Sequence, residues 1–288
     1  MAWTVGANAV MLPELTFEAQ IELCRELGLT HYTFRPRVVP ESKRNEAYSN
    51  WGRHAFDLTP QRLLAEGAAL AGQLQQAGIT PFGTVPNATV TDDDDSLRLH
   101  FDGAAAARAG RVRVQPPGYP QGPFDYPALL ARTIKAYEHV VPLARAAGVK
   151  MVIETHAGSL ATSPGLAYAI VQHFDPADVG VIFDLPNFAR EGGVNPHLAV
   201  AVLGRWIDHL HFGGCRWIAD VPRDEHGFRK PQSVMCELAD SELYVPTWLG
   251  ALRAAGIDVP LIVEDYTPDV SGAQRLRTTV EQLRRFDT

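Results

Sequence analysis

The chain has few cysteines and no long hydrophobic run. Cys24, Cys215 and Cys236 are its only cysteines, and no two of them have C-x-x-C spacing. Neither a disulfide framework nor a thiolate zinc site is therefore indicated. No segment approaches the ~18 uninterrupted apolar residues of a membrane span, and the start, MAWTVGANAVML, has no basic region or long apolar stretch. We expect a cytoplasmic protein with reduced cysteines and no membrane partner.

The chain also has no excess of basic residues. Lys and Arg total 26 against 33 Asp and Glu, so the formal net charge is −7. Nucleic-acid surfaces are basic, and no nucleic-acid partner is expected. A hydrophobic content of 46% over 288 residues is enough to bury a large core. Since no stretch has the composition of a linker, we expect a single domain over residues 1–288.

Short apolar segments alternate with amphipathic segments along the chain, and their number is about the eight strands that close a (β/α)₈ TIM barrel. Several of the amphipathic segments end at a glycine before the next apolar run, as in LQQAGIT and ARAAGVK. Strands are predicted at 5–11, 31–35, 80–84, 111–115, 150–154, 179–184, 207–212 and 260–264. Helices are predicted at 16–27, 60–77, 96–109, 126–147, 164–174, 245–255 and 272–285.

The loops that follow predicted strands are longer than those that follow predicted helices. The longest are 35–59, 116–125 and 213–242. Loops of more than ~12 to 15 residues in a compact domain are usually functional or disordered. In a TIM barrel these loops surround the mouth at the carboxyl ends of the strands, where active sites lie.

Four of the predicted strands end in a residue that can bind a metal. They are Glu154 in VIETHAG, Asp184 in GVIFDLPN, His211 in WIDHLHFGG and Glu264 in VPLIVEDY. Residues at these ends of a parallel barrel converge on one mouth. Three carboxylates and one imidazole suit one divalent metal with open positions, Mn²⁺, Co²⁺ or Mg²⁺ ahead of Zn²⁺. The alternative for each glutamate is a salt bridge to an arginine on a neighbouring strand, which would not account for all four positions together.

In these four motifs the chain resembles the sugar phosphate isomerase/epimerase family, which has the xylose isomerase-like TIM barrel and includes ketose 3-epimerases, hydroxypyruvate isomerase and inosose dehydratase. The resemblance is clearest over residues 150–266. It implies that Glu154, Asp184, His211 and Glu264 bind one metal, with Glu154 and Glu264 as the acid/base pair. It also implies a homo-oligomer and a role in carbohydrate metabolism. Asn187 stands where the ketose 3-epimerases usually have a histidine.

Further residues near the predicted mouth are candidates for binding substrate. His156 follows Glu154 by two residues and either orients substrate or closes a loop; Asn187 either bonds a substrate hydroxyl or shapes the turn after Pro186. Five basic residues lie in the loop 35–59, where they suit a substrate phosphate or carboxylate, a solvated loop or a subunit contact: Arg35, Arg37, Lys43, Arg44 and Arg53. Arg35, nearest its strand, is the one we place in the site. Arg216, with Trp217 and His226, is assigned to a lid.

The leading hypothesis is an enzyme, a metal-dependent isomerase or epimerase. It would act on a small sugar, or a sugar-derived carbonyl compound, by removing a proton to give a metal-stabilised enediolate. The second hypothesis is a lyase that uses the same site for β-elimination, as in inosose dehydratase or in enzymes that cleave C-glycosides. The third is a sugar-binding barrel without a reaction, which would have little reason to keep all four ligands.

Overall fold

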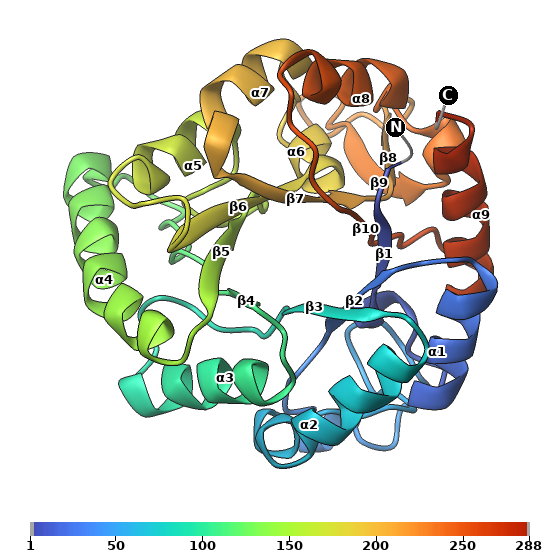
Figure 1. Ribbon diagram of the computed structural model, residues 1–288. Helices are drawn as coiled ribbons and strands as arrows, with labels where there is room; N and C mark the ends of the chain where they lie inside the picture. Colours follow the sequence, from blue (N-terminus) through green and yellow to red (C-terminus); the bar gives the residue numbers. More distant parts are fainter. Residues whose placement is uncertain (1–2, 287–288) are drawn as a thin grey trace.

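The structure is a computed structural model that describes residues 3–286. Its strands form a closed ring with the helices outside it (Figure 1), and every neighbouring pair of barrel strands is parallel, in the order β1-β10-β7-β6-β5-β4-β3-β2. The predicted TIM barrel is confirmed. The barrel strands are β1 (Val5–Asn8), β2 (His31–Phe34), β3 (Thr80–Thr84), β4 (Arg111–Arg113), β5 (Lys150–Glu154), β6 (Val179–Asp184), β7 (Ile207–Phe212) and β10 (Leu261–Val263).

The helices pack against the outside of the ring. They are α1 (Phe17–Glu26), α2 (Pro60–Gln76), α3 (Asp94–Ala106), α4 (Tyr126–Ala146), α5 (Pro164–Val171), α6 (Leu185–Arg190), α7 (Pro196–Leu203), α8 (Val245–Ala254) and α9 (Gly272–Arg284). Every residue of β6 and β7 is buried, because the barrel interior covers one face of each strand and helices cover the other. Across residues 3–286, no helix has the length and apolar character needed to cross a membrane.

The predicted glycine ends of four helices are confirmed, whereas α3 begins two residues before its predicted start, and α3 and α5 each end three residues earlier than predicted. The glycines that follow α1, α2, α4 and α8 all have positive φ, which a residue with a side chain rarely adopts: Gly28, Gly78, Gly148 and Gly256. Asp93 begins α3 by accepting a hydrogen bond from the Ser96 backbone N–H at 2.9 Å. Short capped joints of this kind fix the strands in register and leave the longer loops at the opposite mouth.

Several element bounds differ from the predictions. β1 ends at Asn8, whose side-chain oxygen accepts a hydrogen bond from the Val10 N–H at 3.2 Å and turns the chain into a 3₁₀ helix, Ala9–Met11. β2, β4 and β10 are also shorter than predicted. Helices α6 and α7 are not among the predicted helices; each contains a proline near its start, Pro186 in α6 and Pro196 in α7, a residue that is also typical of turns. Both prolines lie in the first turn, where a missing N–H costs nothing.

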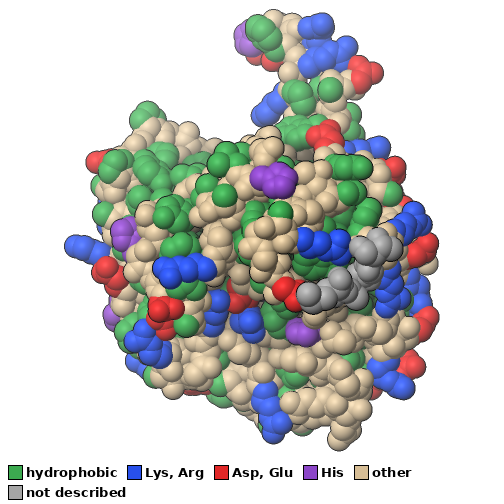
Figure 2. Space-filling view, turned by 45° about the horizontal axis from the view of Figure 1, so that its top comes forward, with side chains coloured by type: hydrophobic (Ala, Val, Ile, Leu, Met, Phe, Trp, Pro, Cys, Tyr) green, Lys and Arg blue, Asp and Glu red, His purple; other side chains and the backbone are tan. Residues whose placement is uncertain are grey.

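The segment 213–242, predicted as a loop, contains an antiparallel hairpin. Strands β8 (Gly214–Ile218) and β9 (Gln232–Cys236) pair with Cys215 opposite Met235. Most residues between the two strands are exposed. In Figure 2 a narrow lobe projects from an otherwise rounded body and carries several Lys and Arg side chains. An exposed hairpin would project in this way. Alternation along β8 gives the hairpin one face toward the barrel and one toward solvent.

The base of the hairpin tolerates no side chain at Gly214. A Cβ there would lie 2.6 Å from the Glu237 carbonyl oxygen, which is backbone and cannot rotate away. We expect Gly214→Ala to lower the free energy of unfolding by roughly 1–3 kcal/mol through overpacking. Gly72→Ala in α2, where a Cβ meets nothing within 4 Å, should raise it by about 0.5–1 kcal/mol. Urea unfolding of both variants measures this; equal stability of the two would contradict the packing at the hairpin base.

Candidate metal centre and its cavity

Four strand ends bring Glu154, Asp184, His211 and Glu264 together. One ligand atom from each lies within 4.8 Å of those of the other three, and all four side chains are buried. Register explains the convergence: Glu154 pairs with Ile182 on β6, and Asp184 pairs with His211 on β7. The four residues come from β5, β6, β7 and the residue that follows β10.

All three carboxylates point at a single nitrogen, Nδ1 of His211. It lies 3.1 Å from Oε1 of Glu154 and 3.4 Å from Oδ2 of Asp184, and Oε2 of Glu264 also contacts it. A ring nitrogen carries at most one hydrogen, so it cannot satisfy three acceptors. Among the described residues, Oε2 of Glu264 and Nε2 of His211 have no hydrogen-bond partner although both are buried. This surplus of buried acceptors is what a divalent cation would complement, so the residues fit a metal.

The negative charges of the three carboxylates and their burial shift the pKa values of the group. Burial raises the pKa of Asp184 to about 6, and the charge of Glu154 adds to this against the opposing contact with His211. Burial lowers the pKa of His211, but the charge of Glu264 and the contacts with all three carboxylates raise it well above its usual value. The metal-free group therefore holds protons where a cation would otherwise balance the charge.

Arg113 and Gln115 hold Glu154 in place. Nη1 of Arg113 donates to Oε2 of Glu154 at 2.5 Å, and Nη2 donates to the Pro86 carbonyl at 2.9 Å. The Glu154 backbone N–H donates to Oε1 of Gln115 at 2.8 Å. Burial raises the pKa of Glu154, but Arg113 and then His211 hold it well below its usual value. The neighbouring-strand salt bridge therefore exists, and it occupies one oxygen while the other faces His211.

Asp184 and Glu264 are oriented by their own strand-end neighbours. Oδ1 of Asp184 accepts a hydrogen bond from the Asn187 N–H at 2.7 Å and so caps α6, which leaves Oδ2 for the metal group. Tyr266 donates its hydroxyl hydrogen to Oε1 of Glu264, which leaves Oε2 toward His211. Each carboxylate thus has one oxygen committed to the protein and one directed at the centre.

A cavity of about 230 Å³ opens beside Glu154 and Glu264. Three of the four predicted substrate residues, Arg35, His156 and Asn187, line it. Sequence reasoning did not place the other lining residues here: Arg37, Trp51, Asn87, Arg113, Arg190, Met235 and Tyr266. A sequence signal existed for Arg113, because Arg111 and Arg113 alternate with valines on one strand and so share a face.

His156 also lines a second cavity, of about 300 Å³, together with Asn87 and Arg113. Its Nδ1 lies 2.7 Å from the Ala157 carbonyl oxygen, which can only accept. Nδ1 therefore carries the hydrogen and donates it, and in the neutral ring Nε2 is left as an acceptor. The loop hydrogen bond and an orienting role toward substrate are compatible.

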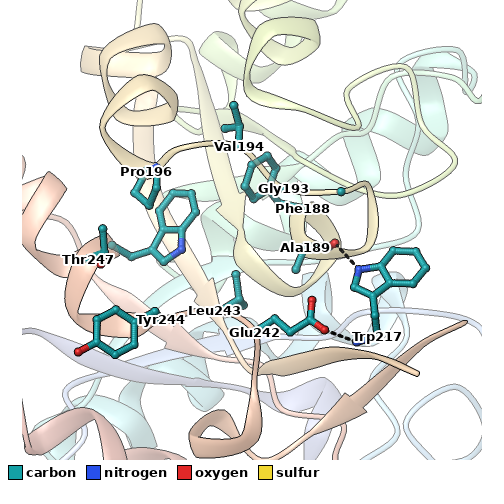
Figure 3. Close-up of a pocket in the computed structure, with 12 residues that line it drawn as sticks. Phe188, Ala189, Gly193, Val194, Pro196, Trp217, Glu242, Leu243, Tyr244 and Thr247 are labelled. Atoms are coloured by element: carbon teal, nitrogen blue, oxygen red, sulfur yellow. Dashed lines mark hydrogen bonds between the residues drawn. The ribbon is translucent and has the colours of Figure 1, made fainter. Parts of the chain in front are cut away.

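Arg216 lies outside this cavity. Arg216 is exposed on β8 and does not line the cavity, because it follows Cys215 in a strand and points to the opposite face. Met235, opposite Cys215, reaches the cavity instead. The Trp217 side chain anchors the hairpin to α6 by donating to the Ala189 carbonyl at 3.2 Å, while its backbone N–H donates to Glu242 at 2.9 Å (Figure 3). In this structure Trp217 therefore makes a structural contact and His226 is exposed in the turn, and the lid of Arg216, Trp217 and His226 stays a prediction.

Comparisons with known proteins agree with this architecture. A family model described as xylose isomerase-like TIM barrel matches residues 49–286, so the chain belongs to that family. No curated protein sequence matches the chain significantly.

Solved structures that cover nearly the whole chain share the fold at low identity. The IOLI protein with a bound zinc atom has a TM-score of 0.72 and 15% identity over 100% of this chain and 99% of its own. The 3-keto-D-glucoside 4-epimerase YcjR from E. coli has a TM-score of 0.69 and 12% identity over 98% and 99%. The probable 3-DHS dehydratase AsbF from Bacillus anthracis has a TM-score of 0.73 and 12% identity over 98% of each chain. At these identities the similarity establishes the fold.

The four-residue group predicts metal binding that depends on Asp184. We expect one divalent cation per chain, and we expect Asp184→Asn to weaken Mn²⁺ binding at least about 100-fold, since even residues that only support metal ligands contribute ~10- to 100-fold. An amide oxygen still caps α6, so the fold should be kept. Asp94→Asn, in the exposed acidic start of α3, is the matched control. Elemental analysis and calorimetric titration measure both; equal affinities in the two variants would rule out the group as the metal site.

Metal affinity should also weaken as the pH falls. The cation must displace the proton on His211 at neutral pH and, below the Asp184 pKa of about 6, a second proton. Each displaced proton costs about tenfold in affinity per pH unit. Titrations with Mn²⁺ from pH 5 to 8 should therefore show a slope that steepens below pH 6, and the steepening should be lost in Asp184→Asn. A flat profile would contradict the protonation of the metal-free group.

Proposed function

We propose that the protein is a divalent-metal-dependent isomerase or epimerase of a small sugar or sugar-derived carbonyl compound. The observation that carries the proposal is that Glu154 and Glu264 line one cavity and also belong to the group that could hold a metal. A carboxylate beside a Lewis acid is suited to removing a proton next to a carbonyl, and a second carboxylate to returning one. Cytoplasmic location and a homo-oligomer stay predictions from sequence.

A bound divalent cation would supply stabilisation of the negative charge that develops on the carbonyl oxygen. Glu264 is the better base of the pair, because within the described residues no arginine is paired with it, whereas Glu154 is in an ion pair with Arg113. We assign Glu264 to proton removal and Glu154 to proton return, which requires Glu154 to take up a proton from water before it delivers one. Return to the same carbon would give an epimer, and return to the neighbouring carbon would give an isomer.

Other cavity residues are suited to holding a polyhydroxy compound. Nε2 of His156 is an acceptor for a hydroxyl, and the Asn187 amide can both donate and accept. The rings of Trp51 and Tyr266 lie 4.9 Å apart at the cavity wall and offer faces for C–H groups. These groups would orient the substrate and keep water from the carbon that loses its proton.

Replacing Glu264 tests the proposal. In the Mn²⁺-loaded enzyme, we expect Glu264→Gln to keep the fold and lower kcat by roughly 10²- to 10⁴-fold, the usual contribution of a general base. Glu225→Gln, on the exposed hairpin turn, should retain full activity. Proton NMR of candidate ketoses in D₂O gives the rate and the product. Deuterium in a recovered isomer identifies isomerisation or epimerisation, whereas an unsaturated or cleaved product identifies the lyase.

Removing the metal tests whether turnover depends on it. Dialysis against a chelator should abolish turnover, and adding back Mn²⁺, Co²⁺, Mg²⁺ or Zn²⁺ in turn should restore it to different extents. Full activity in the chelated protein would overturn the proposal. A metal content near zero, with sugar binding intact and no exchange of deuterium, would support a sugar-binding barrel instead.

A further inference from the structure

The geometry points to a substrate that carries a carboxylate or a phosphate, held by Arg35 and Arg37. This inference rests on the proposed function, because it names the substrate class for the same cavity. Both guanidinium groups line the cavity that Glu154 and Glu264 also line. Their planar forks match the oxygens of either anion.

Arg35 is a buried cation without an anionic partner. Its side chain is 7% exposed, Nη1 donates to the Val85 carbonyl at 2.7 Å, and Nη2 donates to Oδ1 of Asn87 at 3.0 Å. Its Nε is buried and has no hydrogen-bond partner within residues 3–286. Its hydrogen-bond partners are all neutral, and the charge of Glu264 acts on it only from outside salt-bridge distance, so no carboxylate pairs with it directly.

Arg37 is in the same situation. It is 8% exposed and its Nη2 donates to the Gly52 carbonyl, a neutral group. Within the described part of the chain, neither Arg35 nor Arg37 is in a salt bridge, although Arg113 in the same cavity is paired with Glu154. The charge of Asp57 acts on Arg37 only from outside salt-bridge distance. Two buried guanidinium groups that share a cavity without a directly paired carboxylate are costly unless a ligand supplies one.

The formal charges of the other groups at the centre balance one another without Arg35 and Arg37. Glu154, Asp184 and Glu264 contribute three negative charges, which a divalent cation and Arg113 would balance. Arg190, exposed at the rim of the cavity, adds another positive charge. With the metal bound, the unbalanced charge of the cavity is therefore positive, in a protein whose net charge is −7. A substrate with one anionic group restores the balance.

The charges of Arg37 and Arg35 also act on a neighbouring histidine. His54 is buried, and burial together with the charges of Arg37 and Arg35 lowers its pKa to about 4, against a weaker opposing contact with the Asn50 carbonyl. Trp51 closes this side, with its ring 5.9 Å from the Arg35 guanidinium carbon. The loop 35–59 thus forms a cationic pocket beside the metal centre, which makes the substrate a sugar acid or a sugar phosphate.

The competing role for both arginines is structural, since each ties loop carbonyls together. Binding measurements separate the two roles. We would titrate the Mn²⁺-loaded protein with D-fructose, D-fructuronate and D-fructose 6-phosphate, and with inorganic phosphate as a probe independent of sugar stereochemistry. We expect at least one anion to bind about tenfold or more tightly than D-fructose, with an affinity that falls as salt is raised. Preference for the uronate or for the phosphates identifies the kind of anion.

Arg35→Gln and Arg37→Gln should each remove this preference, lowering anion affinity about tenfold or more while Mn²⁺ affinity is unchanged. Arg44→Gln, exposed on the same loop, is the matched control and should keep it. If one variant fails to fold, the other and the salt dependence of the unaltered protein still decide. No anion preference in the unaltered protein, or a preference that survives both substitutions, would overturn the inference.

Deuterium exchange into the sugars tests the isomerase proposal separately from the anion pocket. Exchange into D-fructose without any anion preference would leave the isomerase proposal standing and defeat the anion pocket. Arginine-dependent anion binding with no metal-dependent exchange on any of the sugars would establish the pocket and defeat the isomerase proposal.

Discussion

The convergence of three buried carboxylates on one imidazole nitrogen is the constraint on which the site depends. Glu154, Asp184 and Glu264 cannot all be satisfied by Nδ1 of His211, and like charges at this separation repel strongly where water is excluded. The cost is partly offset because the other oxygen of each carboxylate accepts a hydrogen bond from a nearby protein group. What remains is a set of oxygens aimed at one point, whose charge a divalent cation would offset.

The same hydrogen bonds connect the centre to the surrounding loops. Asp184 caps α6, and α6 in turn provides the Ala189 carbonyl to which the hairpin is anchored through Trp217. Tyr266, which orients Glu264, packs against Trp51 of the loop 35–59. The four-residue group, the hairpin and the loop 35–59 are therefore connected by two short chains of contacts.

The sequence was sufficient to predict the barrel and the convergence of the four residues that could hold a metal, and insufficient to predict their surroundings. A strand-end position in a parallel barrel fixes which mouth a residue faces, so Glu154, Asp184, His211 and Glu264 could be placed from local pattern alone. Arg113 and Arg37 could not, because their roles depend on which segments the closed ring and an aperiodic loop bring beside them. The exposure of Arg216 could not be predicted for a related reason: without the hairpin register, alternation could not be assigned to a face.

The negative and positive side chains of this cavity lie on different parts of the fold. The carboxylates of Glu154, Asp184 and Glu264 lie at the end of a strand or directly after one. A rigid strand backbone can hold several like charges close together for a metal. The two uncompensated guanidinium groups follow β2, at the start of a long loop, where the chain can adjust around a ligand that arrives and leaves. A negative centre deep in the barrel and a positive pocket beside it would orient a substrate that has a carbonyl at one end and an anion at the other. The carbon to lose its proton is then selected by its distance from the anion, a specificity that the metal group alone does not supply.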